Sequence, residues 1–266
     1  MHDLSPAAWQ PLLTTRRLGR TGVILQHTLT STNTVLKDAA RTGALAEAVA
    51  LCEQQTAGRG RLDRTWSSPE GQGVWMSVLL RPQLPPEKTP MITFCAALAM
   101  TKAVRSLTGL DARIKWPNDV VLSGHKVCGV LLEAGFTPEG QMFVVIGSGL
   151  NIRRGAYPPE LTERAVSLEE LCPPPGREAL IAAYLNGLEA AVDAVTSGGF
   201  TAIEEEYRAL SCTLGREVQV LSPAETFTGT ALSVDETGAL LVRTEDGATR
   251  RVLAGDVSVR GVMGYV

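Results

Sequence analysis

Apolar residues recur along the chain in short runs with the length of β-strands, and a few longer runs have helical spacing. The short runs are bounded by glycine, proline, asparagine or aspartate, the residues that most often form turns. Strands are predicted at residues 23–29, 48–53, 73–81, 112–116, 119–122, 126–134 and 141–149. Helices are predicted at residues 35–40, 91–107, 177–195 and 200–210.

The connections between the predicted strands of residues 112–149 are very short. Connections of this length cannot contain a crossover helix, so these strands should pair antiparallel. The chain is therefore predicted to be an α+β protein, with a mostly antiparallel mixed sheet packed by helices, rather than a doubly wound protein.

The pattern of apolar and polar residues changes near residue 214. Val218 and Val220 alternate with polar residues, and further strand-like runs follow at 227–234, 240–243 and 249–253. These runs predict a small, barrel-like, all-β appendage. The predicted domains are a large unit at 22–213, which has the size of a catalytic domain, and the appendage at 214–266.

Residues 1–21 show no sustained period and contain Pro6 and Pro11. They are predicted to form a loosely ordered lead-in with one short helix. A segment of this length is too short for a three-helix DNA-binding module.

The composition predicts an ordinary cytoplasmic protein. A net charge of −3 over 266 residues argues against bare nucleic acid as the main partner. The N-terminus lacks a basic and then apolar signal, and no apolar run approaches the ~20 residues of a membrane span. Five cysteines lie far apart without metal-ligand spacing, so buried, reduced thiols are expected and no protein-bound metal.

One loop, residues 54–66, is too polar and too rich in glycine to be core. Gly58 and Gly60 are expected to adopt positive φ and to turn backbone N–H groups into a concave anion site. Arg59, Arg61 and Arg64 add planar, permanently charged groups that match carboxylate or phosphate oxygens. The loop therefore predicts the binding of a small anionic ligand.

Two familiar nucleotide-binding patterns are excluded. The run Gly58-x-Gly60-x-x-Asp63 lacks the third glycine of the dinucleotide fingerprint, and the chain contains no P-loop sequence. The pentapeptide 115–119, Lys-Trp-Pro-Asn-Asp, is more distinctive, because it places an amide and a carboxylate at a tight turn beside a lysine.

Five motifs together resemble the biotin protein ligase family in order and spacing. They are Ser31-Thr32-Asn33, the segment 55–66, the segment 115–119, the segment 126–131 and the segment 147–151. The resemblance spans residues 22–266. It implies a catalytic domain with the class II synthetase and biotin ligase fold, followed by an SH3-like C-terminal domain.

The resemblance also implies a two-step reaction. Biotin and MgATP give biotinoyl-5'-AMP and pyrophosphate, and a lysine of a biotin carboxyl carrier domain then attacks the mixed anhydride. Mg²⁺ would arrive with ATP. Both steps handle negative charge, so positioning and electrostatic stabilisation should carry the rate.

Matching positions assign the site residues. The residues implied for biotin are Ser31, Thr32, Asn33, Gln55, Arg59, Gly60, Arg61, Lys126 and Gly129. Those implied for ATP or AMP are Arg61, Arg64, Trp66, Asn118, Lys126 and Asn151. Catalysis would rest on Lys126 as the main cation, with Arg59, Arg61 and Asp119; the aspartate would orient a lysine or help to deprotonate the acceptor amine.

The sequence departs from the family pattern at Asp63, where glycine is usual, and in the missing N-terminal DNA-binding module. A ligase without repressor activity is therefore expected. The family often dimerises through sheet edges, and residues 126–134 or 141–149 would supply such an edge. Two alternatives stay open: a lipoate or octanoate protein ligase, and a non-catalytic biotin sensor.

Overall fold

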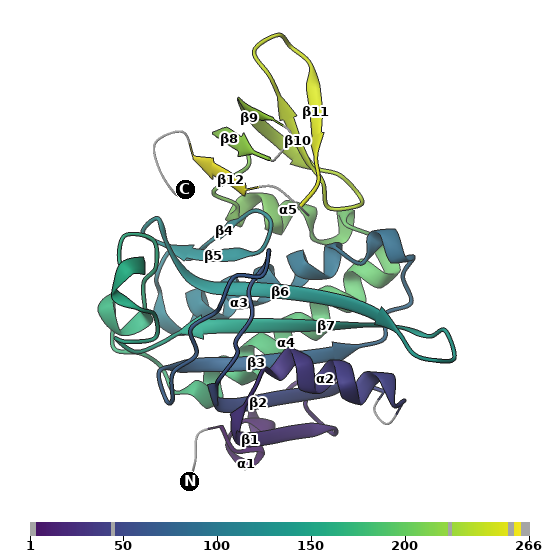
Figure 1. The fold of residues 1–266 in the computed structure, drawn as a ribbon, viewed down its shortest axis with the longest axis vertical. Helices are drawn as coiled ribbons and strands as arrows, with labels where there is room; N and C mark the ends of the chain where they lie inside the picture. Colours follow the sequence, from purple (N-terminus) through teal and green to yellow (C-terminus); the bar gives the residue numbers. More distant parts are fainter. Residues whose placement is uncertain (1–3, 44–45, 223–224, 255–257, 262–266) are drawn as a thin grey trace.

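A seven-stranded mixed sheet forms the centre of the protein (Figure 1). The computed structural model describes residues 4–43, 46–222, 225–254 and 258–261. The strand order is β1-β2-β3-β7-β6-β5-β4. The bounds are β1 Val23–Leu29, β2 Ala48–Gln55, β3 Gly73–Leu80, β4 Arg113–Lys115, β5 Asp119–Leu122, β6 His125–Phe136 and β7 Met142–Asn151.

The first two strands pair parallel and the other neighbours pair antiparallel. The parallel pair exists because helix α2, Thr32–Arg41, crosses over between β1 and β2. The short connections after residue 112 do form antiparallel pairs. The predicted α+β class with a mostly antiparallel mixed sheet is therefore confirmed.

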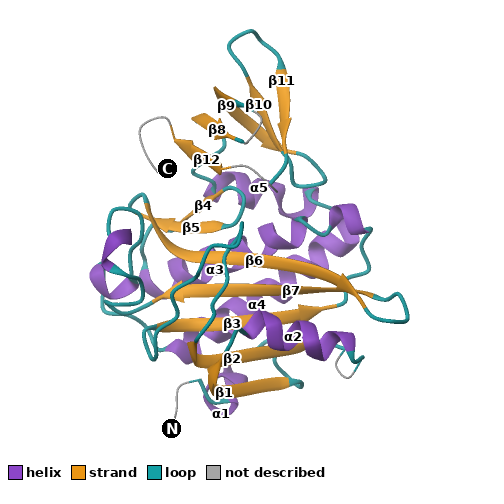
Figure 2. Ribbon diagram, in the orientation of Figure 1, coloured by secondary structure: helices purple, strands orange, loops and turns teal. Residues whose placement is uncertain are grey.

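Helices cover both faces of this sheet (Figures 1 and 2). Leu36 and Ala40 of α2 pack on Ala48 and Ala50 of β2. The alternate residues of β2 face the larger core beneath α3 and α4. The helices on that side are α3 Met91–Thr108, α4 Arg177–Gly198 and α5 Thr201–Leu210.

Short helical turns complete the architecture. They are α1 Pro6–Trp9, η1 Gln10–Leu12, η2 Pro86–Lys88, η3 Pro159–Leu161 and η4 Leu168–Glu170. Helix α3 is buried almost all round, and Gly109 ends it with φ 73°, the left-handed conformation expected of a glycine C-cap.

By length and composition alone, α4 is long and apolar enough to cross a membrane, although the sequence analysis expected no run of that length. In the fold, 56% of its most apolar window is buried inside the protein. Core helices commonly reach this hydropathy, and α4 packs against α3 as one of them.

A second sheet of five strands follows, in the order β11-β10-β9-β8-β12. Its strands are β8 Glu217–Leu221, β9 Thr226–Val234, β10 Leu240–Arg243, β11 Thr249–Val252 and β12 Ser258–Gly261. All four of its pairings are antiparallel. The first four strands were predicted; β12 was not, because four residues ending in glycine carry little pattern.

The two sheets share one core. The indole Nε1 of Trp116, beside β4, donates to the carbonyl of Gly238, 3.2 Å away, in the turn between β9 and β10 of the second sheet. Val218, Val220 and Leu240 belong to the same apolar cluster as the helices of the first sheet. The domain limits 22–213 and 214–266 therefore stay a prediction.

The prediction that the N-terminal segment is loosely ordered is wrong for residues 4–20. Leu4 and Trp9 are fully buried, and Leu18 nearly so. Helix α1, which contains Trp9, packs against α4, more than 150 residues away, and a contact so distant in sequence leaves no local pattern.

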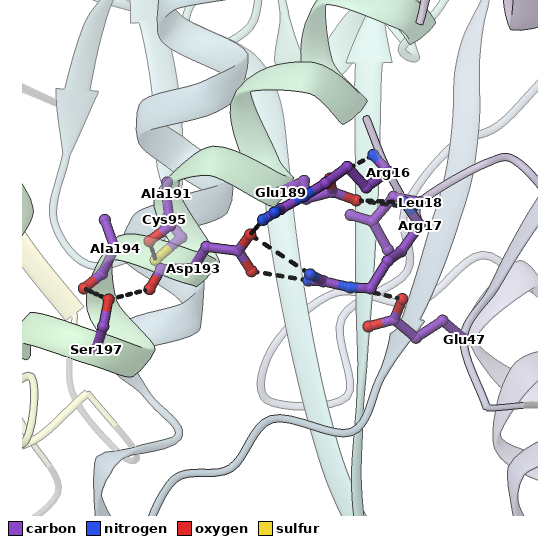
Figure 3. Close-up of polar contacts among 10 residues, drawn as sticks. All are labelled: Arg16, Arg17, Leu18, Glu47, Cys95, Glu189, Ala191, Asp193, Ala194 and Ser197. Carbon is purple, nitrogen blue, oxygen red and sulfur yellow. Dashed lines mark hydrogen bonds and ion pairs between the residues drawn. The ribbon is translucent and has the colours of Figure 1, made fainter. Parts of the chain in front are cut away.

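A carboxylate of α4 fastens this segment (Figure 3). Glu189 accepts hydrogen bonds from the backbone N–H groups of Arg16, Arg17 and Leu18 at 2.7, 3.0 and 2.8 Å. Asp193, one turn later, pairs with the side chains of both arginines. Burial alone would raise the pKa of Glu189, but the three N–H groups outweigh burial and lower it.

The pairing of β6 and β7 shows which of these two strands has an unpaired side. Strand β7 is paired along both sides, so the expectation that it supplies a dimer edge is wrong. Strand β6 pairs with β5 from His125 as far as Gly129. Among the described residues, the rest of β6 has a neighbouring strand, β7, on one side only. An edge-to-edge contact through β6 stays a prediction.

Replacement of Glu189 by Gln should lower the free energy of unfolding by about 2 kcal/mol, because three N–H groups lose a charged acceptor. Since the pKa of Glu189 is lowered on folding, its stabilisation is present above the ordinary pKa of 4.5 and is lost as the pH falls through the folded value.

Urea unfolding measured at pH 7 and again below pH 4.5 checks this prediction. The difference between Glu189→Gln and the parent should shrink at the lower pH. The exposed Glu205→Gln on α5 is the control and should change stability by less than about 0.5 kcal/mol. Equal stability of Glu189→Gln and the parent at pH 7 would contradict the assignment.

Candidate active site

A cavity of about 530 Å³ lies against the central strands β6 and β7. The start of α2, the loop between β2 and β3, the turn between β4 and β5, the segment 156–165 after β7, and strand β12 also line it. Figure 2 shows the β2–β3 loop crossing the sheet on the face that carries α2. Every residue that the sequence predicted for the site lines this cavity.

Glycines make the floor of the cavity flat enough for side chains to lie on it. A Cβ at Gly147 would come within 2.2 Å of the Asn33 Oδ1, and one at Gly149 within 2.2 Å of the Trp66 Nε1. At Gly129 the neighbour is the Lys126 ammonium, 2.9 Å from a Cβ. Only glycine at these positions lets the predicted site residues reach their places.

The arginine loop folds back on itself. Arg59 and Thr65 form an antiparallel bridge, and the Gly60 N–H donates to the Arg64 carbonyl at 2.7 Å. The positive φ angles fall at Leu62 and Asp63, both at 55°, and not at the two glycines as predicted. Gly58 is needed for close approach instead, since its Cβ would lie 2.3 Å from the Trp66 carbonyl.

Asp63 therefore occupies a left-handed position. Glycine adopts such angles without steric cost, and aspartate is among the few other residues that visit them. The conformation gives a physical reason for glycine in the family pattern. It also explains why aspartate is a tolerable replacement there.

The three loop arginines differ in environment. Arg59 is 46% exposed and its Nη2 lies 3.3 Å from Glu133 on β6. Arg61 reaches inward, and its Nη1 donates to the Asn118 Oδ1 at 3.1 Å. Burial lowers the pKa of Arg61, with the charge of Asp119 acting in the opposite direction. Arg64 is exposed at the edge of the cavity.

Lys126 is one of the cations that line the cavity. Its Nζ lies 2.6 Å from Asp119 Oδ1 and 4.9 Å from the centre of the Trp66 ring. The expectation that Asp119 orients a lysine agrees with this geometry. The Trp66 Nε1 is buried and has no hydrogen-bond partner among the residues that the structure describes.

Sequence reasoning missed two cations of the cavity. Lys115 is buried, and burial lowers its pKa to about 8, with Asp119 opposing the shift and Lys126 and Arg260 adding to it. Arg260 comes from β12 of the second sheet. The pentapeptide motif contained Lys115 and could have flagged it, whereas no local signal marks Arg260.

The polar end of the cavity is built from the start of α2. The Thr32 backbone N–H donates to the Gln55 Oε1 at 2.9 Å, and the Gln55 Nε2 donates to the Ser68 Oγ at 2.7 Å. Ser31 is the N-cap residue of α2 but makes no side-chain cap hydrogen bond. It is one of the residues that line the cavity.

The two asparagines predicted for the nucleotide are tied to the backbone. Asn118 Nδ2 donates to the Val130 carbonyl at 2.6 Å, and Asn151 Nδ2 donates to the Val166 carbonyl at 3.3 Å. Within the described ranges, no group of three or more His, Cys, Asp or Glu side chains is placed to hold a metal ion.

Comparisons with known proteins identify the family. A model of the biotin/lipoate A/B protein ligase family matches residues 25–151, and a model of the biotin protein ligase C terminal domain matches residues 213–260. The bifunctional ligase/repressor BirA of Bacillus subtilis is 33% identical over 240 residues, which are 89% of this chain and 74% of the relative. A biotin-(acetyl-CoA-carboxylase) ligase of Mycobacterium tuberculosis is 34% identical over 234 residues, 85% of each chain.

Solved structures agree with the sequence relatives. The biotin protein ligase of Aquifex aeolicus in complex with biotin and ATP superposes with a TM-score of 0.77 at 26% identity, covering 91% of this chain and 99% of that one. The biotin protein ligase of Leishmania major in complex with biotin gives a TM-score of 0.61 at 25% identity, covering 88% and 98%. With its fold, its cavity and these matches, the chain belongs to the biotin/lipoate A/B protein ligase family.

Proposed function

We propose that this protein is an ATP-dependent biotin protein ligase. In the first step the biotin carboxylate attacks the α-phosphorus of ATP, which forms biotinoyl-5'-AMP and releases pyrophosphate. In the second step a lysine amine of a biotin carboxyl carrier domain attacks the acyl carbon, which forms an amide and releases AMP and a proton. The M. tuberculosis relative named as a ligase for acetyl-CoA-carboxylase supports a carrier domain of that kind as the acceptor.

The observation that carries the proposal is the gathering of cations around one cavity whose other end is polar and uncharged. Lys126, Arg61 and Arg64 line the first part, and Ser31, Thr32 and Gln55 line the second. A ligand with a neutral, hydrogen-bonding ring and a distant carboxylate fits both ends, which is the chemistry of biotin. The matched C terminal domain of biotin protein ligases supports biotin over lipoate.

The cations that line the cavity are suited to the first step. Lys126 lines the same cavity as the polar residues and the loop arginines, so it could bridge the biotin carboxylate and the α-phosphate as charge accumulates. Arg59 and Arg61 would close over this junction, and Arg64 would meet the outgoing phosphates. No covalent enzyme intermediate is needed, because the two substrates only have to be held in line.

The nucleotide would lie beside Trp66, with Asn118 and Asn151 as polar contacts. We propose that magnesium enters with the phosphates of ATP as part of the substrate. Gly60 and Gly129 would allow biotin to approach the backbone closely. Ser31, Thr32, Asn33 and Gln55 would contact the ureido ring.

Asp119 has a distinct role in the second step. Its carboxylate holds Lys126 before the reaction, at 2.6 Å. The same carboxylate could act as a general base and accept the proton of the incoming lysine amine as the amide bond forms and AMP leaves. We also propose a cytoplasmic location and no direct nucleic-acid or membrane partner.

Biotin-dependent exchange of labelled pyrophosphate into ATP tests the proposal directly. Exchange with biotin, and not with lipoate or octanoate run in parallel, is the expected result. Exchange with lipoate instead would make the protein a lipoate ligase. Tight biotin binding without exchange would make it a non-catalytic sensor.

Replacement of Lys126 by Met should lower the rate of adenylate formation by about 10² to 10³-fold, because one positioned cation is lost where charge develops. Rapid-quench measurement of biotinoyl-AMP with the purified variant checks this. The control is Lys102→Met, which removes an exposed lysine paired with Glu206 on α5. Adenylate formation by Lys126→Met at the rate of Lys102→Met would refute the role.

The arginine loop should become ordered when biotin and MgATP are added, because its like charges repel until an anion arrives. Trypsin cleavage after Arg59 and Arg64, both exposed, should then slow by about tenfold or more. Cleavage after the exposed Arg41 at the end of α2 is the internal control and should not change. Protection at Arg41 alone, or none at all, would contradict loop closure.

A further inference from the structure

The turn between β4 and β5, which lines the cavity, is held by residues outside the first sheet. The Trp116 backbone N–H donates to the Thr213 Oγ1 at 3.0 Å, and the Trp116 indole Nε1 donates to the Gly238 carbonyl at 3.2 Å. Trp116 is 1% exposed, so neither N–H group can turn to bulk water if its acceptor is displaced. Both N–H groups of this residue therefore depend on the part of the chain that follows α5.

The segment that joins the two sheets extends this contact. Ile114 of β4 and Ser211 form a parallel bridge, and the Cys212 N–H donates to the Ile114 carbonyl at 2.9 Å. Residues 211–213 therefore lie along β4, which is the last strand in the order of the first sheet. A displacement of the second sheet would reach β4 and the turn that follows it.

The β9–β10 turn that carries Gly238 is firmly held. Asp235 Oδ1 accepts hydrogen bonds from the N–H groups of Thr237 and Ala239 at 2.8 and 3.1 Å. Asp235 Oδ2 lies 2.5 Å from the Nε of Arg251 on β11. Burial alone would raise the pKa of Asp235, but Arg251 and these N–H groups hold it at about 2, so the carboxylate is charged at neutral pH. The Gly238 carbonyl is therefore a fixed acceptor for the indole.

On its other side, Trp116 is followed by two polar residues of the cavity. Asn118 Oδ1 accepts from the Arg61 Nη1 at 3.1 Å, and Asp119 Oδ1 lies 2.6 Å from the Lys126 Nζ. These contacts set the positions of two cations that line the cavity. A site that acts by positioning loses rate steeply when such groups move by about 1 Å.

We propose that Trp116 is a positioning residue that couples the second sheet to adenylate formation: the Gly238 carbonyl fixes the indole, and the fixed indole holds Asn118 and Asp119 in place. The proposal rests on the ligase function proposed above. The polar end of the cavity is built on α2 and β2 instead, so the binding of biotin should depend much less on this contact than the reaction does.

Single-turnover formation of biotinoyl-AMP by the full chain, at saturating biotin and MgATP, tests the proposal. Trp116→Phe keeps an aromatic ring and removes the indole N–H, and it should slow this step by about tenfold. The affinity for biotin, measured by isothermal titration, should change by less than about threefold.

The matched control is Trp9→Phe, which loses another buried indole hydrogen bond, from Nε1 to the Leu4 carbonyl at 3.0 Å. Trp9 lies on α1, and α1 does not line the cavity. Adenylate formation by this variant should therefore stay within about twofold of the parental rate.

A second pair of variants acts from the other end of the contact. Asp235→Ala loosens the β9–β10 turn and should slow adenylate formation by about five- to tenfold. Asp246→Ala loosens the exposed β10–β11 turn of the same sheet, where the Ala248 N–H donates to Asp246 Oδ1 at 3.1 Å, and should leave the rate unchanged. This pair carries the test if Trp116→Phe fails to fold.

The double variant shows whether the two ends act through one contact. Because Asp235 is proposed to act through Trp116, Asp235→Ala combined with Trp116→Phe should be little slower than Trp116→Phe alone. Two independent structural defects would instead multiply their effects on the rate.

The outcomes are distinguishable. If Trp116→Phe slows adenylate formation no more than Trp9→Phe does, or weakens biotin binding as much as it slows the reaction, the contact is only structural and the proposal is wrong. Equal rates for Asp235→Ala and Asp246→Ala, or full multiplication of effects in the double variant, would also overturn it. A parent protein that makes no biotinoyl-AMP would refute the ligase function itself, whereas an active parent with these results would refute the positioning role alone.

Discussion

The site depends on holding several positive charges close together before any anion binds. Lys115, Lys126 and Arg61 line the same cavity; burial lowers the pKa of Lys115 and that of Arg61, and the charges of Lys126 and Arg260 lower that of Lys115 further. Asp119 offsets part of this repulsion through its contact with Lys126, and Glu133 does so for Arg59. These carboxylates offset part of the repulsion among the cations of the cavity.

The sheet makes this concentration of charge possible. Strands β6 and β7 pair along their whole shared length, and their glycines leave a floor on which Asn33, Trp66 and Lys126 rest. The loop that carries the arginines is anchored at both of its ends, by Arg59 on Glu133 and by Ser68 on Gln55. A rigid floor and an anchored loop are the arrangement expected of a site that acts by positioning.

Much of this could be predicted from the sequence, because the relevant signals are local. Short apolar runs located the strands from Val23 to Asn151, and short connections predicted the antiparallel pairing of the strands after residue 112. The motif positions located the cavity walls. Contacts distant in sequence could not be predicted: the docking of Trp9 on α4 and the entry of Arg260 into the cavity. The positive φ of Leu62 and Asp63 was also missed, since glycine was the obvious place to expect it.

The fastening of residues 16–18 to Glu189 has a consequence for how the protein forms in the cell. A chain leaving the ribosome exposes Leu4, Trp9 and Leu18 long before α4, their main packing surface, has been synthesised. The large core can close only after about seven tenths of the polypeptide exists. For that interval the early apolar residues are exposed, and a chaperone that shields them would reduce aggregation of the nascent chain.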